Sequence, residues 1–144
     1  AEWIGCRLPA EARWEYACRA GTTTPFSTGN NRTTSQANYN GKYPYKRNAK
    51  GEYRKKTLQV GSFAANAYGL FDMHGNVWEW CSDWYGDYST SAQTNPKGAS
   101  SGSHRVIRGG SWIINAPSCR AADRYVITPG YRYFTIGFRL VSPK

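Results

Sequence analysis

The sequence predicts an α+β domain that is rich in loops and contains one helix and a small antiparallel sheet. Three observations support this class: one segment has helical periodicity, several short strand-like runs are separated by turn residues, and 15 of the 144 residues are glycine. The length suits a single domain with its own hydrophobic core, so residues 1–144 are expected to form one unit. The mean hydropathy of −0.69 and the lack of a long apolar run predict no transmembrane segment.

The helix is predicted over Pro9 to Arg19. Pro9 suits the first helical turn, because proline lacks an amide that would be unpaired there. Four residues, Ala10, Trp14, Ala17 and Cys18, recur at helical spacing and should define the buried face of the helix. Gly21 follows the last of these residues and is the residue type that most often ends a helix.

Residues 22–57 are predicted to be irregular loops, because they are rich in Asn, Gly, Thr and Lys and show no sustained period. Loops of this length in a compact domain usually carry function or are held by a ligand such as a metal ion. Short runs after this segment predict the strands of the sheet. These runs are Leu58–Phe63, Val77–Trp80, Arg105–Ile107, Ser111–Ile114 and Gly137–Val141.

The net charge of +10 is concentrated in part between Lys42 and Lys56, where seven cations accompany the single acid Glu52. Three tyrosines are interleaved with these cations, and such a composition can hold a nucleic-acid backbone. A solvated loop is the favoured interpretation, because no nucleic-acid-binding motif accompanies the charge. Nucleic acid is therefore not expected as a partner.

The four cysteines, Cys6, Cys18, Cys81 and Cys119, lie far apart in the sequence. They form no CxxC pair, which argues against a structural zinc site. Their even number permits two disulfides, whereas a buried free thiol is the default for so small an apolar side chain. Both states remain open, so the cysteines do not indicate a redox compartment.

Four motifs in a fixed order carry a family resemblance. They are RLPAEARWEYA from Arg7, NAYGLFDMHGNVWEW from Asn66, RVIRGGSW from Arg105 and GFRLV from Gly137. Together they closely resemble the formylglycine-generating-enzyme, or sulfatase-modifying-factor, family. The resemblance spans nearly the whole chain and lacks the family's portion before the first motif. It implies a C-type-lectin-like fold with little regular structure.

The resemblance also places a structural calcium ion on Asp72, Gly75, Val77 and Glu79, where Asp72 replaces a family asparagine. Two carboxylates and turn carbonyls close together in sequence suit calcium, which accepts about six to eight oxygen ligands from side chains and backbone. The alternative is that the two acids cap turns or pair with arginine. His74 lies in the same turn and is interpreted as a hydrogen-bonding residue rather than a metal ligand.

The family's enzymes oxidise a substrate cysteine and bind copper through two cysteines that follow the Arg-Gly-Gly-Ser-aromatic motif. Ile113 and Ile114 stand where the first of these thiols would lie, and isoleucine can neither ionise nor ligate copper. Cys119 remains, but one thiolate is not a two-cysteine site, and a packed core thiol is its favoured interpretation. Copper and catalysis are therefore not expected; the alternative is a copper-dependent formylglycine-generating or related oxidase that acts on cysteine.

Residues 105–141 resemble the variable region of a second group of proteins with this fold, the variable proteins of diversity-generating retroelements. In those systems adenines are randomised, usually in asparagine codons, and such codons cannot yield Lys, Glu, Gln, Met or Trp. Thirteen positions alternate with framework-like residues such as Cys119, Arg124 and Gly137, and all thirteen hold residue types that such codons can yield, a result that chance gives roughly one time in fifteen. The positions are Ile113, Ile114, Asn115, Pro117, Ser118, Asp123, Tyr125, Val126, Ile127, Tyr131, Tyr133, Phe134 and Thr135.

These thirteen positions, called the variable positions below, are predicted to form a ligand-binding surface. Tyrosine supplies a large contact area at low entropic cost, and an apolar cluster exposed on a rigid scaffold usually marks a binding site. The alternative is that about a third of these side chains pack inward as core. The predicted function is a non-catalytic domain that binds a protein or another macromolecule. The resemblance suggests display at a cell surface or on a phage, and the compartment itself is unknown.

Overall fold

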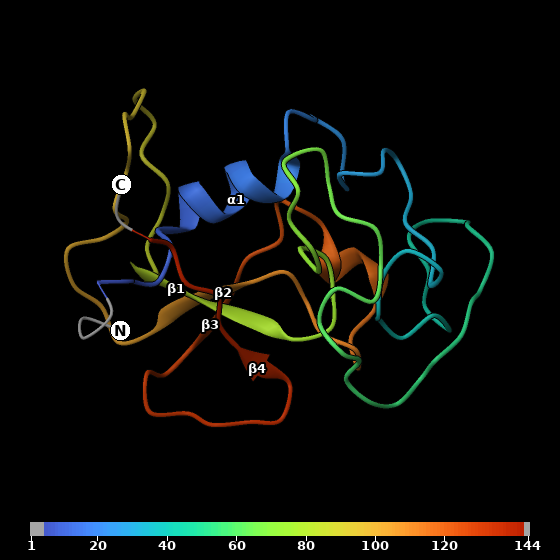
Figure 1. Cartoon of the computed structure of the whole chain (residues 1–144). Helices are drawn as coiled ribbons and strands as arrows, with labels where there is room; N and C mark the ends of the chain where they lie inside the picture. The colour runs from blue at the N-terminus through green and yellow to red at the C-terminus, as the bar shows by residue number, and fades with distance from the viewer. Residues whose placement is uncertain (1–4, 143–144) are drawn as a thin grey trace.

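The computed structural model describes residues 5–142, which form a small twisted sheet with one α-helix across it and long loops at one end (Figure 1). The α+β class predicted from the sequence is confirmed. In chain order, the elements are α1 (Glu11–Arg19), β1 (Trp78–Trp84), β2 (Arg105–Arg108), the short 3-10 helix η2 (Ala116–Cys119), β3 (Tyr125–Ile127) and β4 (Ile136–Gly137).

Helix α1 begins at Glu11, two residues later than predicted, because Ala10 is extended with φ −66° and ψ 148°. The first helical amide is capped from a distant strand: the Glu11 amide donates to a carboxylate oxygen of Asp83 in β1 at 2.8 Å. The helix ends at Arg19. The next residue, Ala20, takes the left-handed conformation expected of Gly21, which also has a positive φ. Trp14 on the inner face of the helix is buried, as its spacing predicts.

The sheet has the order β3-β2-β1-β4. Strand β1 pairs antiparallel with β2, and β2 pairs antiparallel with β3, as predicted for this sheet. Strand β4 instead lies parallel to β1, with Trp78 opposite Ile136. The long connection through residues 128–135 carries the chain from one edge of the sheet to the other, and such a crossover permits parallel pairing.

Two of the predicted strands are wrong. Leu58–Phe63 forms no strand, because the Leu58 amide donates to the Asn76 side chain at 2.9 Å and Gly61 turns the chain with φ +76°. Ser111–Ile114 is a turn, in which the Ile114 amide donates to the Ser111 carbonyl at 3.2 Å. Two consecutive glycines with positive φ precede this turn and end strand β2.

The other predicted strands are found with different ends. Val77–Trp80 corresponds to the longer β1, and Arg105–Ile107 to β2. Gly137–Val141 contributes only its first residue to β4 and a bridge from Val141 to Arg7. Strand β3 lies in a segment for which no strand was predicted.

Two clusters of buried side chains form the core. The first lies between α1 and the sheet and contains Trp14, Cys18, Met73, Cys81, Val106 and Ala121. The second supports the loops and contains Phe26, Ala37, Tyr39, Ala116 and Cys119. All four cysteines are free thiols, and three of them are buried. This agrees with the free-thiol alternative raised by their spacing.

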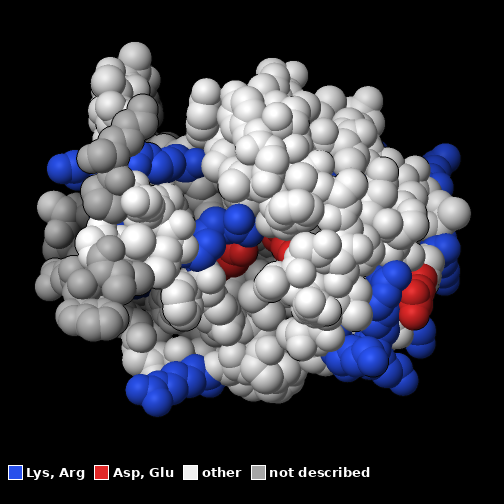
Figure 2. Space-filling view, viewed as in Figure 1, with Lys and Arg blue, Asp and Glu red and all other residues white. Residues whose placement is uncertain are grey.

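Cations dominate the charged surface on the face shown in Figure 2, in keeping with the net charge of +10. Within residues 5–142, no helix is long and apolar enough to cross a membrane.

Candidate ligand-binding surface

The variable positions lie mostly at the surface. Six side chains are exposed, namely those of Ile113, Asn115, Tyr125, Tyr131, Tyr133 and Phe134. Six are half-buried, namely those of Ile114, Pro117, Ser118, Asp123, Val126 and Ile127. Thr135 alone is buried, with 5% of its surface exposed. The three tyrosines are between 46% and 58% exposed, so they are not core residues.

Three of the exposed rings and two half-buried ones form a continuous row, called the aromatic row below. Its members, in spatial order, are Tyr53, Trp112, Phe134, Tyr133 and Tyr131, with successive ring centroids 6.2, 5.8, 4.1 and 5.9 Å apart. Two members, Tyr53 and Trp112, lie outside the variable positions, and sequence reasoning missed them. The position of Trp112 in the Arg-Gly-Gly-Ser-aromatic motif could have drawn attention to it, whereas no local signal pairs it with Tyr53.

Residues 76–78, at the start of β1 and in the turn before it, contact distant parts of the surface. The Trp112 amide donates to the Asn76 carbonyl at 2.9 Å, and the Trp78 amide donates to the Thr135 carbonyl at 2.8 Å. The Trp78 ring also stacks under Tyr125, with centroids 5.5 Å apart and an interplanar angle of 29°. These three contacts bring Trp112, Tyr125 and Thr135 to the same short stretch, residues 76–78.

The first variable segment, residues 113–118, is held to the loops of residues 22–57 through its backbone. The Ile114 carbonyl accepts from the Asn40 amide at 2.9 Å, and the Ala116 amide donates to the Tyr43 carbonyl at 3.0 Å. The side chain of Asn115 caps η2 by accepting from the Ser118 amide at 3.1 Å. The side chain of Ile114 packs against the second core cluster, which is the inward role foreseen for a minority of the variable positions.

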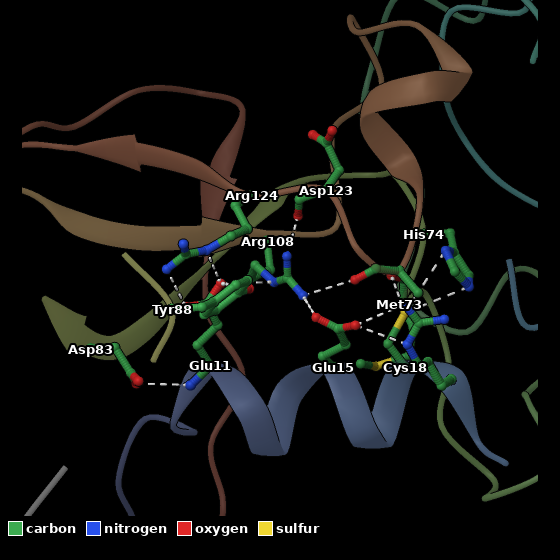
Figure 3. Close-up of polar contacts among 12 residues, drawn as sticks. Glu11, Glu15, Cys18, Met73, His74, Asp83, Tyr88, Arg108, Asp123 and Arg124 are labelled. Atoms are coloured by element: carbon green, nitrogen blue, oxygen red, sulfur yellow. Dashed lines mark hydrogen bonds and ion pairs between the residues drawn. The ribbon is translucent and has the colours of Figure 1, made fainter. Parts of the chain in front are cut away.

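The second variable segment, residues 123–127, is anchored by a fully buried arginine, Arg108 (Figure 3). The Arg108 guanidinium pairs with Glu15 of α1 and donates to the Asp123 carbonyl. It also donates to the Ala121 carbonyl at 2.8 Å. A buried charge is stable only where it is paired and hydrogen-bonded, so this arginine fixes the chain before β3 strongly.

Arg124 provides a further anchor between the variable segments and α1. Its guanidinium forms a bidentate pair with the Glu11 carboxylate, at 2.6 and 2.8 Å (Figure 3). Tyr88 also donates to Glu11 at 3.3 Å. Burial alone would lower the pKa of Arg124, but the hydrogen bonds and attraction to Glu11 outweigh it and raise the pKa. Bidentate pairs of this kind fix geometry as well as charge.

His74 is a structural hydrogen-bonding residue, as predicted. Its Nε2 accepts from the Ser27 amide at 3.1 Å, so the ring proton belongs on Nδ1, which lies 2.8 Å from the Cys119 carbonyl. Burial, assisted by repulsion from Arg32, lowers the pKa of His74 to about 3, and the ring is neutral at pH 7. His74 therefore links the loop at Ser27 to the backbone at the end of η2.

The four residues predicted to bind calcium line one hollow of 310 Å³. Within it, Glu79 receives hydrogen bonds from Arg139 at 2.6 and 2.7 Å and from the Trp14 indole at 2.7 Å. Asp72 accepts from the Gly61 amide at 2.7 Å and has a positive φ of 55°. Both acids thus make the turn and arginine contacts that were the alternative to calcium.

Comparison with known proteins decides the family. The model of the sulfatase-modifying factor enzyme 1-like domain matches residues 1–144. The chain belongs to this family. It is 39% identical to the formylglycine-generating enzyme of Mus musculus, over 97% of this chain and 40% of that protein. It is 42% identical to the serine/threonine-protein kinase pkn1 of Chlamydia caviae, over 96% of this chain and 21% of that protein.

Similarity to two solved structures confirms the C-type-lectin-like fold prediction. The Treponema denticola variable protein 1 superposes with a TM-score of 0.78 and 38% identity, over 94% of this chain and 46% of that one. PvdO from Pseudomonas aeruginosa superposes with a TM-score of 0.79 and 29% identity, over 97% of this chain and 56% of that one. The chain thus spans about half the length or less of the relatives named here.

A calcium ion at this hollow would draw on Asp72, Gly75, Val77 and Glu79, which all border it and can offer carboxylate and carbonyl oxygens, the hard ligands that calcium prefers. Glu79 would have to share its oxygens between the ion and Arg139. Among residues 5–142 no group of three or more His, Cys, Asp or Glu side chains could hold a metal ion, so carbonyls and water would complete the shell.

Cys119, the thiol of the enzymatic alternative, is buried in the second core cluster with 1% of its surface exposed. Its Sγ contacts the Asn115 carbonyl at 3.6 Å. Burial raises the pKa of this thiol far above its usual range, and the thiol is therefore protonated at neutral pH. A protonated, enclosed thiol is poorly suited to copper binding or nucleophilic attack.

Proposed function

We propose that this chain is a non-catalytic ligand-binding domain that displays a diversified C-terminal surface, residues 105–141, on its C-type-lectin-like scaffold. The observation that carries this proposal is how the variable segments are held. Their anchors are backbone hydrogen bonds and the side chains of framework residues such as Arg108, Arg124 and His74. Most side chains at the variable positions contribute little to anchoring the backbone, so residues of other types could replace them without loss of the fold.

The aromatic and aliphatic side chains at the surface favour ligand binding. The aromatic row and the stacked Tyr125 present rigid rings on an ordered backbone. Little binding free energy is therefore lost in ordering these rings when a ligand binds. Ile113 is 42% exposed beside the row and adds aliphatic area. A contiguous apolar patch of this kind on a folded domain usually marks an interaction site.

The similarity to the Treponema denticola variable protein 1 supports the same proposal. The similarity to formylglycine-generating enzymes supports the oxidase alternative, but Ile113 and Ile114 supply no thiol and Cys119 is enclosed. The binding proposal therefore accounts for more of the C-terminal segment than the oxidase does.

The test of the proposal replaces Tyr125, Tyr131 and Tyr133 together by alanine. Binders are first selected against the wild-type chain from a phage-displayed library of small helical proteins. Most independent binders should lose at least about a hundredfold in affinity, because tyrosines at the centre of an interface each contribute about 2 kcal/mol or more. Titration calorimetry measures this loss. The melting temperature should fall by less than about 4 °C, since exposed rings carry little stability.

A matched control replaces three similarly exposed rings outside the variable positions, those of Tyr16, Tyr68 and Phe71. This variant should retain the binders. If the tyrosine variant unfolds, the three tyrosines are core residues. If the control variant reduces binder affinity as much as the tyrosine variant does, the proposed surface is not the preferred binding site. Either result contradicts the proposal.

A structural calcium ion at Asp72, Gly75, Val77 and Glu79 is part of this proposal, and it predicts thermal stabilisation. Calcium at a hundred times its Kd would add about 2.7 kcal/mol, and chelation by EDTA would remove it. Differential scanning calorimetry with and without calcium measures the effect. Asp72→Gly removes one carboxylate at a position where glycine tolerates the positive φ, so its calcium response should be lost. Asp87→Gly, in an exposed loop, should keep it; identical melting curves of the wild type in calcium and EDTA would contradict the site.

A further inference from the structure

We infer that the variable surface is built for acidic protein partners, because fixed cations border the aromatic row at both ends. This inference rests on the proposed binding function and names the chemical class of its ligand: a folded protein surface that carries both apolar side chains and carboxylates. The variable positions supply shape and apolar contact, and the constant part of the scaffold supplies a positive rim.

The rim on one side is the loop of residues 42–56, called the basic loop below. Six of its cations are exposed or nearly so: Lys42, Lys46, Arg47, Lys50, Lys55 and Lys56. Its single acid, Glu52, pairs with Arg54 at 2.9 Å and therefore neutralises none of these six. Figure 2 shows blue atoms gathered at the lower right, where the basic loop lies in Figure 1, with one group of red atoms among them.

The basic loop and the residues just before it are fastened to the variable surface at three points. Backbone hydrogen bonds join Asn40 to Ile114 and Ala116 to Tyr43. Tyr53, near the end of the loop, stacks on Trp112 and is the first ring of the aromatic row. The cations are therefore held beside the first variable segment, and a ligand that covers the aromatic row on that side comes within their field.

The opposite end of the aromatic row is also positive. Arg132 is exposed between Tyr131 and Tyr133 and makes no ion pair or hydrogen bond within residues 5–142. The only acid among the variable positions, Asp123, pairs with Arg120 at 3.1 Å. No unpaired carboxylate therefore opposes the positive rim at the variable positions, and a partner of negative charge is the complementary one.

The character of the row favours a protein over a nucleic acid. Bases bind by stacking on open aromatic faces, but the rings of the row are packed against one another, with Tyr133 and Phe134 only 4.1 Å apart. Ile113 and the half-buried Ile127 offer aliphatic contact, which suits protein side chains rather than bases. The surface thus combines apolar contact with a charged rim, as protein interfaces do.

Cations at the rim should act mainly on the rate of association, and the aromatic row mainly on the rate of dissociation. Measuring the two rate constants therefore tests the role of the cations separately from the role of the aromatic row. The variant Lys42→Glu/Arg47→Glu/Lys50→Glu changes exposed side chains that make no hydrogen bond or ion pair in the part of the chain described. Its matched control, Arg7→Glu/Arg13→Glu/Lys97→Glu, makes the same change in charge in a groove that no variable position lines.

The experiment uses the full chain and two phage-displayed libraries of one helical scaffold with identical apolar residues. One library varies the remaining positions over Asp, Glu, Ser and Ala, and the other over Lys, Arg, Ser and Ala. Binders should come from the acidic library, and surface plasmon resonance should show kon falling by about tenfold or more in the basic-loop variant and in 500 mM NaCl. The control variant should change kon by less than about twofold.

Equal enrichment of the two libraries, or an unchanged kon in the basic-loop variant, overturns the inference while leaving the binding function intact. Binders that lose affinity in neither the basic-loop variant nor the tyrosine variant overturn both. A fluorescein-labelled random 20-mer of single-stranded DNA and its RNA counterpart serve as the nucleic-acid probes. If either binds at 150 mM NaCl as tightly as the selected acidic proteins and competes with them, the partner class inferred here is wrong.

Discussion

Replacing Arg108 by methionine should destabilise the chain by about 3–5 kcal/mol, which is the usual cost of removing one partner of a buried ion pair. Arg108 has no exposed surface and pairs with Glu15, while its Nε lies 3.6 Å from a Glu11 oxygen. The methionine side chain fills much of the volume that Arg108 occupies. It removes the positive charge that lies near Glu11 and Glu15. It also removes the hydrogen-bond donor of the Ala121 and Asp123 carbonyls. Urea unfolding measures the loss.

Arg19→Met is the matched control, because Arg19 pairs with the same acid, Glu15, at 2.8 Å but is 26% exposed. A partly exposed pair four residues apart on a helix contributes about 0.5 kcal/mol, so this variant should lose no more than about 1 kcal/mol. If the two variants lose equal stability, Arg108 is not the anchor described above. Hydrogen exchange at β3 supplies a second measurement: its amides should exchange faster in Arg108→Met than in Arg19→Met, since the carbonyls just before β3 are released.

The sequence predicts the anchored parts of the fold better than its loops. Trp14 and Cys18 recur at the spacing of a buried helical face, and both are core residues. The wrong strand at Leu58–Phe63 shows the limit of local pattern: a short apolar alternation forms a strand only if a partner is available. Here the Asn76 side chain, far along the chain, takes the Leu58 amide instead. Nothing in the sequence of residues 58–63 predicts that contact.

The same limit applies to the site. The alternation with framework-like residues selects the variable positions, the codon argument supports them, and the tyrosines among them do lie at the surface. Tyr53 and Trp112 were missed because their role comes from a contact between segments about sixty residues apart in the chain, which residue type alone does not reveal. The Arg108 anchor is hidden for a similar reason: its motif is visible, but apart from Glu15 its acceptors are backbone carbonyls, and every residue has one.

The second large effect is expected at Gly110, in the Arg-Gly-Gly-Ser-aromatic motif. This glycine has φ +77°, and an added Cβ would lie 2.5 Å from Cys119 Sγ and 3.0 Å from the Ser118 carbonyl oxygen. Gly110→Ala therefore combines the cost of a left-handed alanine, about 1–2 kcal/mol, with overpacking of the core, about 1–3 kcal/mol. Thermal or urea unfolding should show a loss of about 2–5 kcal/mol, with displacement of η2 visible as faster exchange of its amides.

Gly69→Ala separates the two costs, because Gly69 has nearly the same φ, +76°, and an added Cβ there meets nothing within 4 Å. It should lose only the backbone part, about 1–2 kcal/mol. Equal losses in the two variants would contradict the clash. Adding Cys119→Ala to Gly110→Ala removes the nearest atom, and part of the lost stability should return, whereas Cys119→Ala alone should destabilise by leaving a cavity. Such coupling would make the Cys119 thiol a packing partner of the motif glycine, which is the role that its burial and raised pKa indicate.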